Sequence, residues 1–579
     1  MRPIILTTIS ALVLTGSVPA PLMAPAVAQE RPEASTGGDP DRICAPYLER
    51  GLEEMSYGRG PTGRSVGIAP MPAPITPPPP IPSQAQTVVV TGSAAQRVAP
   101  GFLPPREDRE RYAGEQVSAV RAVADEPVST FGVDVDTGSY ANVRRFLQDG
   151  RMPPQAAVRT EELLNYFRYD YPTPADRTRP FSITTDMTTT PWNPNTRLLR
   201  VGLRGYDIAR RERPAANLVF LVDVSGSMMS QDKLPLVQCS LALLAERLNP
   251  RDRVSIVVYA GAAGRVLDPT SDKRRVRDVL MRLQAGGSTA GAAGIQLAYE
   301  TARQNMIPGG INRVVLATDG DFNVGVSSTE TLVDMVERER AAGIQLTTLG
   351  YGTGNYNEAM MEQIADHGNG NYAYIDSPRE AQKVLDQELS STLFTIAQDV
   401  KIQVEFNPAY VAEYRLIGYE NRALREEDFD NDAVDAGDIG AGHQVTALYE
   451  IVPAGSQGWL PSRRYEANRR VAQGTGGSEL AFLRLRYKLP GQDESRLIEQ
   501  PVAASLVRSA RAPTGDTAFA AAVAAYGQLL RGDTNLGRFT FADARALAGR
   551  ASLGDFWRLE FIALTQAAEH HVREERAER

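Results

Sequence analysis

Apolar and polar positions follow two different periods along the chain, and the central region shows both in alternation. Between residues 216 and 395, short apolar runs alternate with longer stretches in which apolar residues recur every three or four positions. The first pattern is typical of strands buried on both faces, and the second of amphipathic helices. Strands are predicted at 217–224, 253–259, 312–318, 345–350 and 372–375, and helices at 233–248, 274–283, 290–304, 329–342, 357–367 and 378–393. This order predicts an α/β fold with a Rossmann-like, doubly wound, mostly parallel sheet.

The regions on either side have other patterns. Residues 106–215 mix short strand and helix signals, which indicates a small α+β module in front of the central domain. Residues 396–579 begin with alternating apolar and polar positions and end with helical periodicity, which predicts a β-sandwich-like, β-rich domain with a helical tail. The predicted strands are 129–135, 181–188, 197–203, 400–406, 443–451 and 480–487, and the predicted helices are 140–149, 158–167, 514–530 and 540–570.

The amino-terminal 28 residues have the features of a secretory signal peptide. Arg2 gives a positive start, residues 4–15 form a short apolar core, and Ala26-Val27-Ala28 is a cleavage site of the A-x-A type. The apolar core is shorter than the roughly 20 residues of a membrane-spanning helix, and no later stretch reaches that length. We therefore expect a cleaved signal, no transmembrane helix, and a periplasmic or envelope-associated protein. Residues 29–105 are rich in proline and are predicted to be a disordered leader.

The composition argues against a nucleic-acid partner but does not decide whether the two cysteines form a disulfide. The 62 basic and 70 acidic residues give a net charge of −8, which provides no electrostatic case for a nucleic-acid partner. The two cysteines are Cys44 and Cys239. Export would permit a disulfide. Because Cys239 falls beside the apolar stripe of the predicted helix 233–248, we interpret it as a buried free thiol.

Three short segments contain the candidate chemistry. Asp223, Ser225 and Ser227 stand at alternate positions directly after an apolar strand. Thr289 follows a pair of glycines, and Asp319 ends a second apolar strand. Carboxylate and hydroxyl oxygens suit hard cations, so a divalent-ion site is predicted at the carboxyl end of the sheet.

The order D-x-S-x-S, then Thr, then Asp resembles the metal-ion-dependent adhesion site of von Willebrand factor type A (VWA) domains. The resemblance implies that the hydroxyls of Ser225, Ser227 and Thr289 bind Mg²⁺ (or Mn²⁺ or Ca²⁺) directly. It implies that Asp223 and Asp319 act mainly through waters, or that one of them also binds the ion directly. It also implies that a Glu or Asp carboxylate of a partner protein completes the coordination. Residues 129–147, 161–167, 445–450 and 558–562 are similar to the flanking regions of bacterial YfbK-like VWA proteins.

Each candidate also has a structural interpretation. Asp and Ser are favoured in strand-end turns and helix caps without any metal. Residues 134–139, Asp-Val-Asp-Thr-Gly-Ser, imitate the start of a calcium loop, but Arg145 stands where the last ligand belongs, so we expect a helix N-cap there. With four histidines and no nucleophile–base motif, catalysis has little support.

The sequence therefore predicts a signal peptide (1–28), a leader (29–105), an α+β module (106–215), a VWA domain (216–395) and a β-rich domain with a helical tail (396–579). The predicted function is metal-dependent protein binding in the cell envelope, with possible peripheral association and no enzymatic activity. Two alternatives remain open. One is a metal-assisted hydrolase, and the other is a structural scaffold whose metal site is occupied from within the chain.

Overall fold

The computed structural model describes residues 40–57 and 110–578, except 115, 210, 290, 321–328, 355, 388–390, 392 and 462–476. The predicted signal peptide and most of the predicted leader lie outside these residues. Among the helices that are described, none combines the length and the apolar character needed to cross a membrane.

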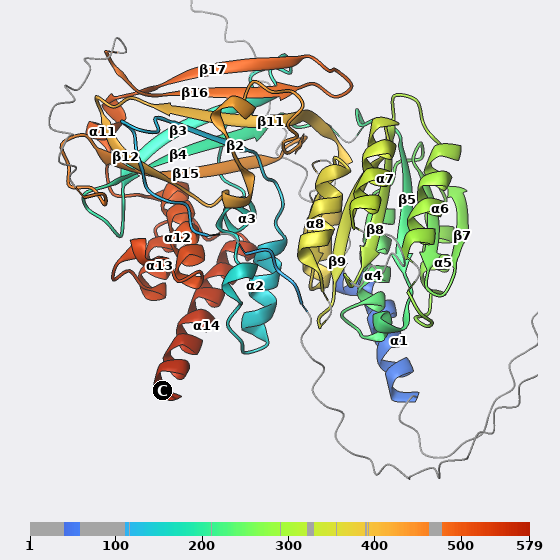
Figure 1. Ribbon diagram of the computed structural model, residues 1–579. Helices are drawn as coiled ribbons and strands as arrows, with labels where there is room; N and C mark the ends of the chain where they lie inside the picture. Colours follow the sequence, from blue (N-terminus) through green and yellow to red (C-terminus); the bar gives the residue numbers. More distant parts are fainter. Residues whose placement is uncertain are drawn as a thin grey trace, which may run out of the picture. The chain divides into compact units, whose positions relative to one another are not determined.

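The central domain is a doubly wound sheet with the strand order β10-β9-β8-β5-β6-β7 (Figure 1). All neighbours in this sheet are parallel except β6 and β7. The strands are β5 (Ala216–Asp223), β6 (Arg253–Tyr259), β7 (Ala263–Thr270), β8 (Ile311–Thr318), β9 (Gln345–Tyr351) and β10 (Tyr372–Ile375). The helices are α4 (Leu234–Glu246), α5 (Lys273–Leu280), α6 (Gly291–Gln304), α7 (Thr329–Ala341), α8 (Glu358–His367) and α9 (Pro378–Gln382). The predicted fold class is confirmed.

The alternation of side chains along β5 explains the two layers of helices. Leu218, Phe220 and Val222 belong to the core that includes α4, whereas Val219 and Leu221 belong to the core that includes α6 and α7. A strand buried on both faces needs apolar residues at every position, which is why its sequence reads as an unbroken apolar run. Strand β7 was not predicted, because it is a half-exposed edge strand with no such run.

A β-sandwich is built from both ends of the described chain. One sheet has the order β1-β12-β15-β4-β3, and the other has the order β13-β2-β11-β16-β17. In the first, β4 pairs with β15, and in the second, β2 pairs with β11, so strands before and after the central domain share each sheet. The strands are β1 (Arg121–Ala122), β2 (Val128–Gly132), β3 (Phe181–Thr189), β4 (Arg197–Gly205), β11 (Thr395–Phe406), β12 (Val411–Ile417), β13 (Ala423–Leu424), β14 (Ile439–Gly440, paired with β11), β15 (Gln444–Pro453), β16 (Glu479–Lys488) and β17 (Ser495–Ala503). The central domain is thus inserted into the sandwich.

A cluster of helices is also formed by segments from both before and after the central domain. An apolar core joins helices from the region before the central domain to the helical tail, and Phe167, Phe519 and Phe561 pack edge to face within it. Such aromatic contacts stabilise beyond the area that they bury. In the described parts of the flanking regions, the α-helices are α2 (Gly138–Gln148), α3 (Thr160–Asn165), α11 (Ser505–Ser509), α12 (Gly515–Leu530), α13 (Phe541–Ala548) and α14 (Phe556–Glu578).

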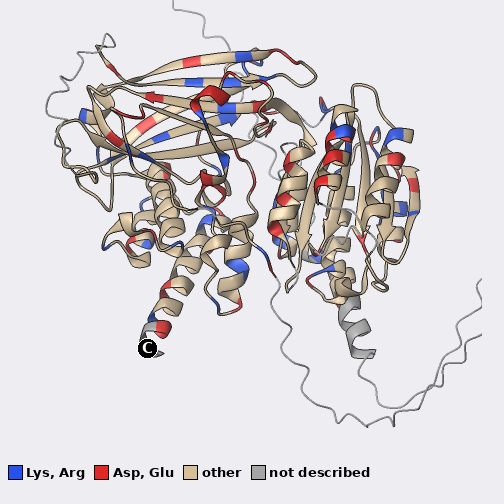
Figure 2. Ribbon diagram, in the orientation of Figure 1, with Lys and Arg blue, Asp and Glu red and all other residues tan. Residues whose placement is uncertain are grey.

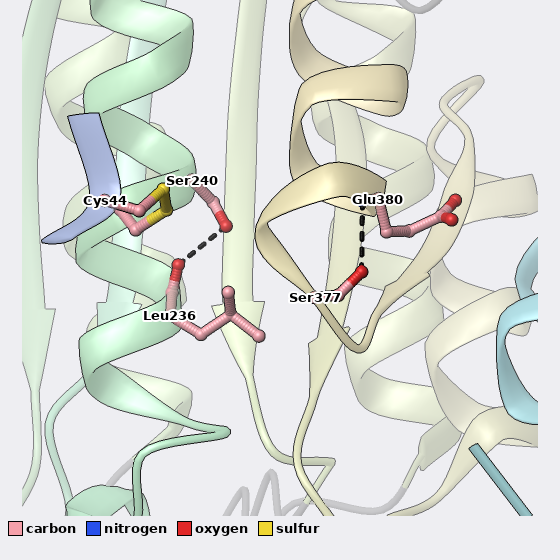
Figure 3. The surroundings of a disulfide bond; sticks show 6 residues. Cys44, Leu236, Ser240, Ser377 and Glu380 are labelled. Carbon is pink, nitrogen blue, oxygen red and sulfur yellow. Dashed lines mark hydrogen bonds between the residues drawn. A yellow bond between two sulfur atoms is a disulfide. The ribbon is translucent and has the colours of Figure 1, made fainter. Parts of the chain in front are cut away.

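Helix α1 (Pro40–Tyr57) lies within the region predicted to be a disordered leader, so that prediction is wrong for these residues. Cys44 and Cys239 form a disulfide between α1 and α4, which also corrects the interpretation of Cys239 as a free thiol (Figure 3). Cys44 and Tyr47, one helical turn apart, are buried in the same core as α4. The burial of Cys44 and Tyr47 and the disulfide together attach α1 to α4. The composition of residues 40–57 alone did not predict this helix.

An ion-pair layer connects α8 of the central domain to the flanking regions. Acidic residues line α8 (Figure 2), and Glu358, Glu362 and Asp366 lie one turn apart along it. Arg422 donates to Glu362 at 3.2 Å and to Asp366 at 2.6 Å. Arg159 donates to Glu362 and lies 3.7 Å from Glu358. We call these five residues the α8 ion-pair layer.

Candidate metal centre

Asp223, the last residue of β5, is fully buried and held by three hydrogen bonds. Its Oδ1 accepts the backbone N–H of Ser225 at 2.8 Å. Its Oδ2 accepts the hydroxyl of Tyr259 and the hydroxyl of Thr318, each at 3.0 Å. The strand end therefore presents a carboxylate in a fixed orientation, and neither hydroxyl partner belongs to the motif found in the sequence.

The two serines of the motif converge. Ser225 Oγ and Ser227 Oγ are 3.0 Å apart. Ser225 occupies the N-cap position of a single turn of 3₁₀ helix, Gly226–Met229, and we call residues 225–229 the serine turn. Ser225 is buried and Ser227 is half-buried, so the pair lies at the surface end of the site. Two hydroxyl oxygens at this separation can serve as neighbouring ligands of one cation.

The glycine loop before Thr289 lies directly against this turn. Gly226 N–H donates to Gly287 C=O at 3.0 Å, and Gly286 N–H donates to Val224 C=O at 2.8 Å. Gly287 has φ +87°, a conformation that side chains disfavour, and this explains the glycine at that position. The half-buried Thr289 follows two residues later. The structure thus brings the second predicted segment to the first.

Asp319 follows β8 directly and is also fully buried. Its Oδ2 accepts a hydrogen bond from the ammonium of Lys233 at 2.8 Å. Lys233 occupies the N-cap position of α4 and is itself buried. Nothing in the motif pointed to this lysine, because the sequence places it only at the start of a predicted helix.

The electrostatics of the site suit a cation. Burial raises the pKa of Asp223, and the nearby charge of Asp319 raises it further. A divalent ion would offset this cost, and hydroxyl and carboxylate oxygens are the donors that Mg²⁺, Mn²⁺ and Ca²⁺ prefer. The residues present therefore fit such an ion, which Ser225, Ser227 and Thr289 would hold with Asp223 and Asp319 in support.

The Asp134–Ser139 segment is not organised as a second site of this kind. Thr137, at the N-cap position of α2, makes no side-chain capping bond, so the capping prediction is wrong in that detail. Asp134 instead accepts Arg422 Nε at 3.2 Å, and Asp136 accepts the N–H of Tyr372 at 3.0 Å. Oxygens of Asp134, Glu162 and Glu362 lie within 4.8 Å of one another, but arginines and backbone N–H groups hydrogen-bond to them.

Comparison with known proteins shows to which family the chain belongs. The model of the von Willebrand factor type A domain matches residues 217–387, one described as von Willebrand factor matches 106–200, and the carboxyl-terminal model of the uncharacterized protein YfbK matches 391–570. The chain is 47% identical to the uncharacterized protein YfbK of Escherichia coli over 470 residues, 79% of this chain and 81% of that protein. The chain belongs to the YfbK family. It is a VWA-domain protein, and VWA domains mediate protein–protein interactions.

More distant similarities are confined to parts of the chain or are weak. The inter-alpha-trypsin inhibitor heavy chain H4 of Homo sapiens is 27% identical over 192 residues, 31% of this chain and 20% of that protein. The solved structure of a von Willebrand factor type A protein from Catenulispora acidiphila is 14% identical, with a TM-score of 0.34, and the match covers 66% of this chain and 80% of that one.

Proposed function

We propose that this YfbK-family protein is an exported binding protein that captures a partner through a divalent ion. The ion, Mg²⁺ or Mn²⁺, binds to Ser225, Ser227 and Thr289, with Asp223 and Asp319 in support. The observation that carries this proposal is the backbone pairing of two loops that are distant in the sequence, Gly226 with Gly287 and Val224 with Gly286, beside the converged serine hydroxyls.

The ligand set determines what the ion can bind. Three neutral hydroxyls leave most of the charge of a divalent ion uncompensated, and Mg²⁺ retains exchangeable water positions in such sites. An anionic group that replaces one of these waters gains a charge-assisted contact. A Glu or Asp side chain of a partner protein is the natural candidate for that group. Met229, which is 59% exposed at the end of the serine turn, offers apolar contact area beside it.

A binding role is favoured over hydrolysis by the surroundings of the site. A metal-assisted hydrolase needs a general base within reach of the attacking water. Among the described residues, the four histidines contact groups outside the site: His367 contacts Glu337 at 2.7 Å, His443 Nδ1 accepts the N–H of Gly440 at 3.3 Å, His570 contacts Glu574 at 3.1 Å, and His571 lies 3.4 Å from Leu147 C=O. A scaffold whose ion is occupied by a carboxylate of the same chain is the second candidate, and crosslinking of the intact chain separates it from capture of a partner.

Export is the other part of the proposal. The predicted signal peptide supports it, and so does the Cys44–Cys239 disulfide, since structural disulfides persist in oxidising compartments such as the periplasm. We expect the mature chain to begin near Gln29. Amino-terminal sequencing of the protein from envelope fractions checks this, and an intact Met1 would contradict it.

Calorimetric titration of the purified mature chain with Mg²⁺ and Mn²⁺ tests the ion site. Ser225→Ala and Asp223→Ala should each weaken binding by at least about tenfold, because each removes a ligand or its support. Ser255→Ala is the matched control: Ser255 is a buried serine of the same sheet whose hydroxyl has no hydrogen-bond partner. Measurable metal binding with the same affinity in Ser225→Ala, Asp223→Ala and the unmodified protein would overturn the site.

Capture of a partner protein from envelope extract tests whether the bound ion bridges the two proteins. It should require Mg²⁺ or Mn²⁺, should be abolished by EDTA, and should weaken in Thr289→Ala and Asp319→Ala but not in Ser255→Ala. Capture that is unchanged in EDTA would contradict an ion-bridged contact. If crosslinking instead joins a Glu or Asp of residues 396–579 to the serine turn, the site is occupied from within the chain.

A further inference from the structure

Lys233 reaches the candidate metal site from the start of α4. Its Nζ lies 2.8 Å from Asp319 Oδ2, and the exposed fractions of the two side chains are 3% and 0%. A buried ammonium needs a carboxylate partner, and a buried carboxylate needs a cation, so each of these groups satisfies the other. The site therefore already contains one positive charge from the chain itself.

The surrounding backbone is shaped for this lysine. Gly352, with φ +70°, lies against its aliphatic stem, and a Cβ at Gly352 would come within 2.5 Å of both Cγ and Cε of Lys233. Any side chain at Gly352 would thus displace the lysine. The missing side chain at Gly352, in the β9–α8 connection, therefore leaves the space that the stem of Lys233 occupies beside Asp319.

Asp319 cannot serve both cations equally well. A divalent ion that uses Asp319, directly or through a water, comes close to the ammonium, and like charges in a poorly screened site repel strongly. We infer that Lys233 competes with the divalent ion for Asp319 and thereby lowers the metal affinity of the site. The inference rests on the proposed function, because it assigns a regulator to the same ion site.

The competition has a consequence for partner binding. A partner's carboxylate adds negative charge at the ion, and this offsets the repulsion between the ion and the ammonium. The ion and the partner should therefore bind more tightly together than separately, with the lysine setting the size of this coupling. In a chain that lacks the ammonium of Lys233, the ion should bind tightly even when no partner carboxylate is present.

Lys233→Met tests the inference, because methionine keeps an unbranched apolar stem beside Gly352 and removes the charge. Calorimetry with Mn²⁺ and with Mg²⁺ on the mature chain should show binding about tenfold tighter or more in Lys233→Met than in the unmodified protein. The matched control is Lys401→Met. Lys401 is an equally buried lysine of the sandwich that donates to the carbonyls of Asp428 and Asn431, and its loss should leave metal affinity unchanged.

Thermal unfolding gives a second readout. In EDTA, Lys233→Met leaves Asp319 buried without the ammonium, so its Tm should fall, and saturating Mg²⁺ should raise that Tm by more than it raises the Tm of the unmodified protein. Lys233→Gln, which retains a donor toward Asp319 without charge, provides the same comparison should the methionine variant fold only in Mg²⁺.

The outcomes separate the two proposals. Equal or weaker metal binding in Lys233→Met, with binding by the unmodified protein intact, overturns the role of Lys233 and leaves the ion site standing. Binding in Lys233→Met and none in the unmodified protein supports the competition in its strongest form. The absence of binding in both folded proteins overturns the ion site and the competition together.

Discussion

The carboxylate of Asp223 owes its orientation to two hydroxyl groups that lie outside the recognised motif. Tyr259 at the end of β6 and Thr318 at the end of β8 both donate to Oδ2. Loss of a group that orients a metal-supporting side chain typically lowers metal affinity about 10- to 100-fold. Three adjacent strands of the sheet thus converge on one carboxylate.

Tyr259→Phe should lower the affinity for Mg²⁺ and Mn²⁺ roughly tenfold, since it removes one donor and leaves the ring packed in the same core. Tyr299→Phe is its control, because Tyr299 lies in that core with a buried hydroxyl that has no hydrogen-bond partner. Calorimetry on the two variants decides the matter. Indistinguishable affinities would show that Tyr259 does not orient the site.

The sequence could predict the motif residues but not their supports. Asp223, Ser225 and Ser227 are adjacent in sequence and follow a recognisable strand, so spacing alone identifies them. Lys233 and Tyr259 become relevant only because the chain folds back on itself. A lysine at a helix start and a tyrosine in a strand are both ordinary, and neither residue type signals the contact that it makes.

Among the secondary-structure elements, α1 departs most from prediction. Its apolar residues recur at helical spacing, but Pro46 lies inside it and it stands next to a proline-rich stretch, so the segment was predicted as part of the leader. The disulfide partner, Cys239, is 195 residues away in the chain. Two cysteines so far apart give no geometric information in sequence, and Cys239 also satisfies every expectation for a buried free thiol. The disulfide attaches α1 to α4, and this attachment could not be inferred from the composition.

Removal of this link should destabilise the central domain. Cross-linking across such a long segment restricts the unfolded chain, and loss of a native disulfide typically costs about 2 to 5 kcal/mol. The double variant Cys44→Ala/Cys239→Ala should lose a free energy of unfolding in this range, measured by urea denaturation. Dithiothreitol should reproduce the loss in the unmodified protein and should have no effect on the variant. If reduction leaves the urea midpoint unchanged, α1 does not stabilise the domain through the disulfide.

At the scale of the whole molecule, chain order and spatial order differ. The parallel sheet was predictable because its strands and helices alternate locally. The sandwich was predictable only as a class, since β4 pairs with β15 and β2 with β11 across the whole central domain. The alternation of apolar and polar residues along a strand shows that one of its faces is buried, but it does not identify the strand with which it pairs. The two flanking regions therefore looked separate in sequence and form common sheets in the structure.

The α8 ion-pair layer joins these parts, and it should make stability depend on pH. Burial raises the pKa of Glu358 from its ordinary 4.5 to about 7, an effect that Arg159 opposes and Glu362 reinforces. A raised pKa means that the folded protein holds this proton more tightly than the unfolded chain does. The contribution of Glu358 to stability is therefore fully present below pH 4.5 and is lost as the pH rises through 7.

Glu358→Gln removes this titration and retains a carbonyl oxygen for Asn142, which donates to Glu358 Oε1 at 3.2 Å. Relative to the unmodified protein, the variant should gain on the order of 2 kcal/mol of unfolding free energy between pH 5 and pH 8. Urea denaturation at several pH values measures this difference. Glu300→Gln, at an exposed glutamate of α6, should show no such trend. A difference between Glu358→Gln and the unmodified protein that stays constant from pH 5 to pH 8 would show that Glu358 is ionised throughout, with Arg159 compensating its charge fully.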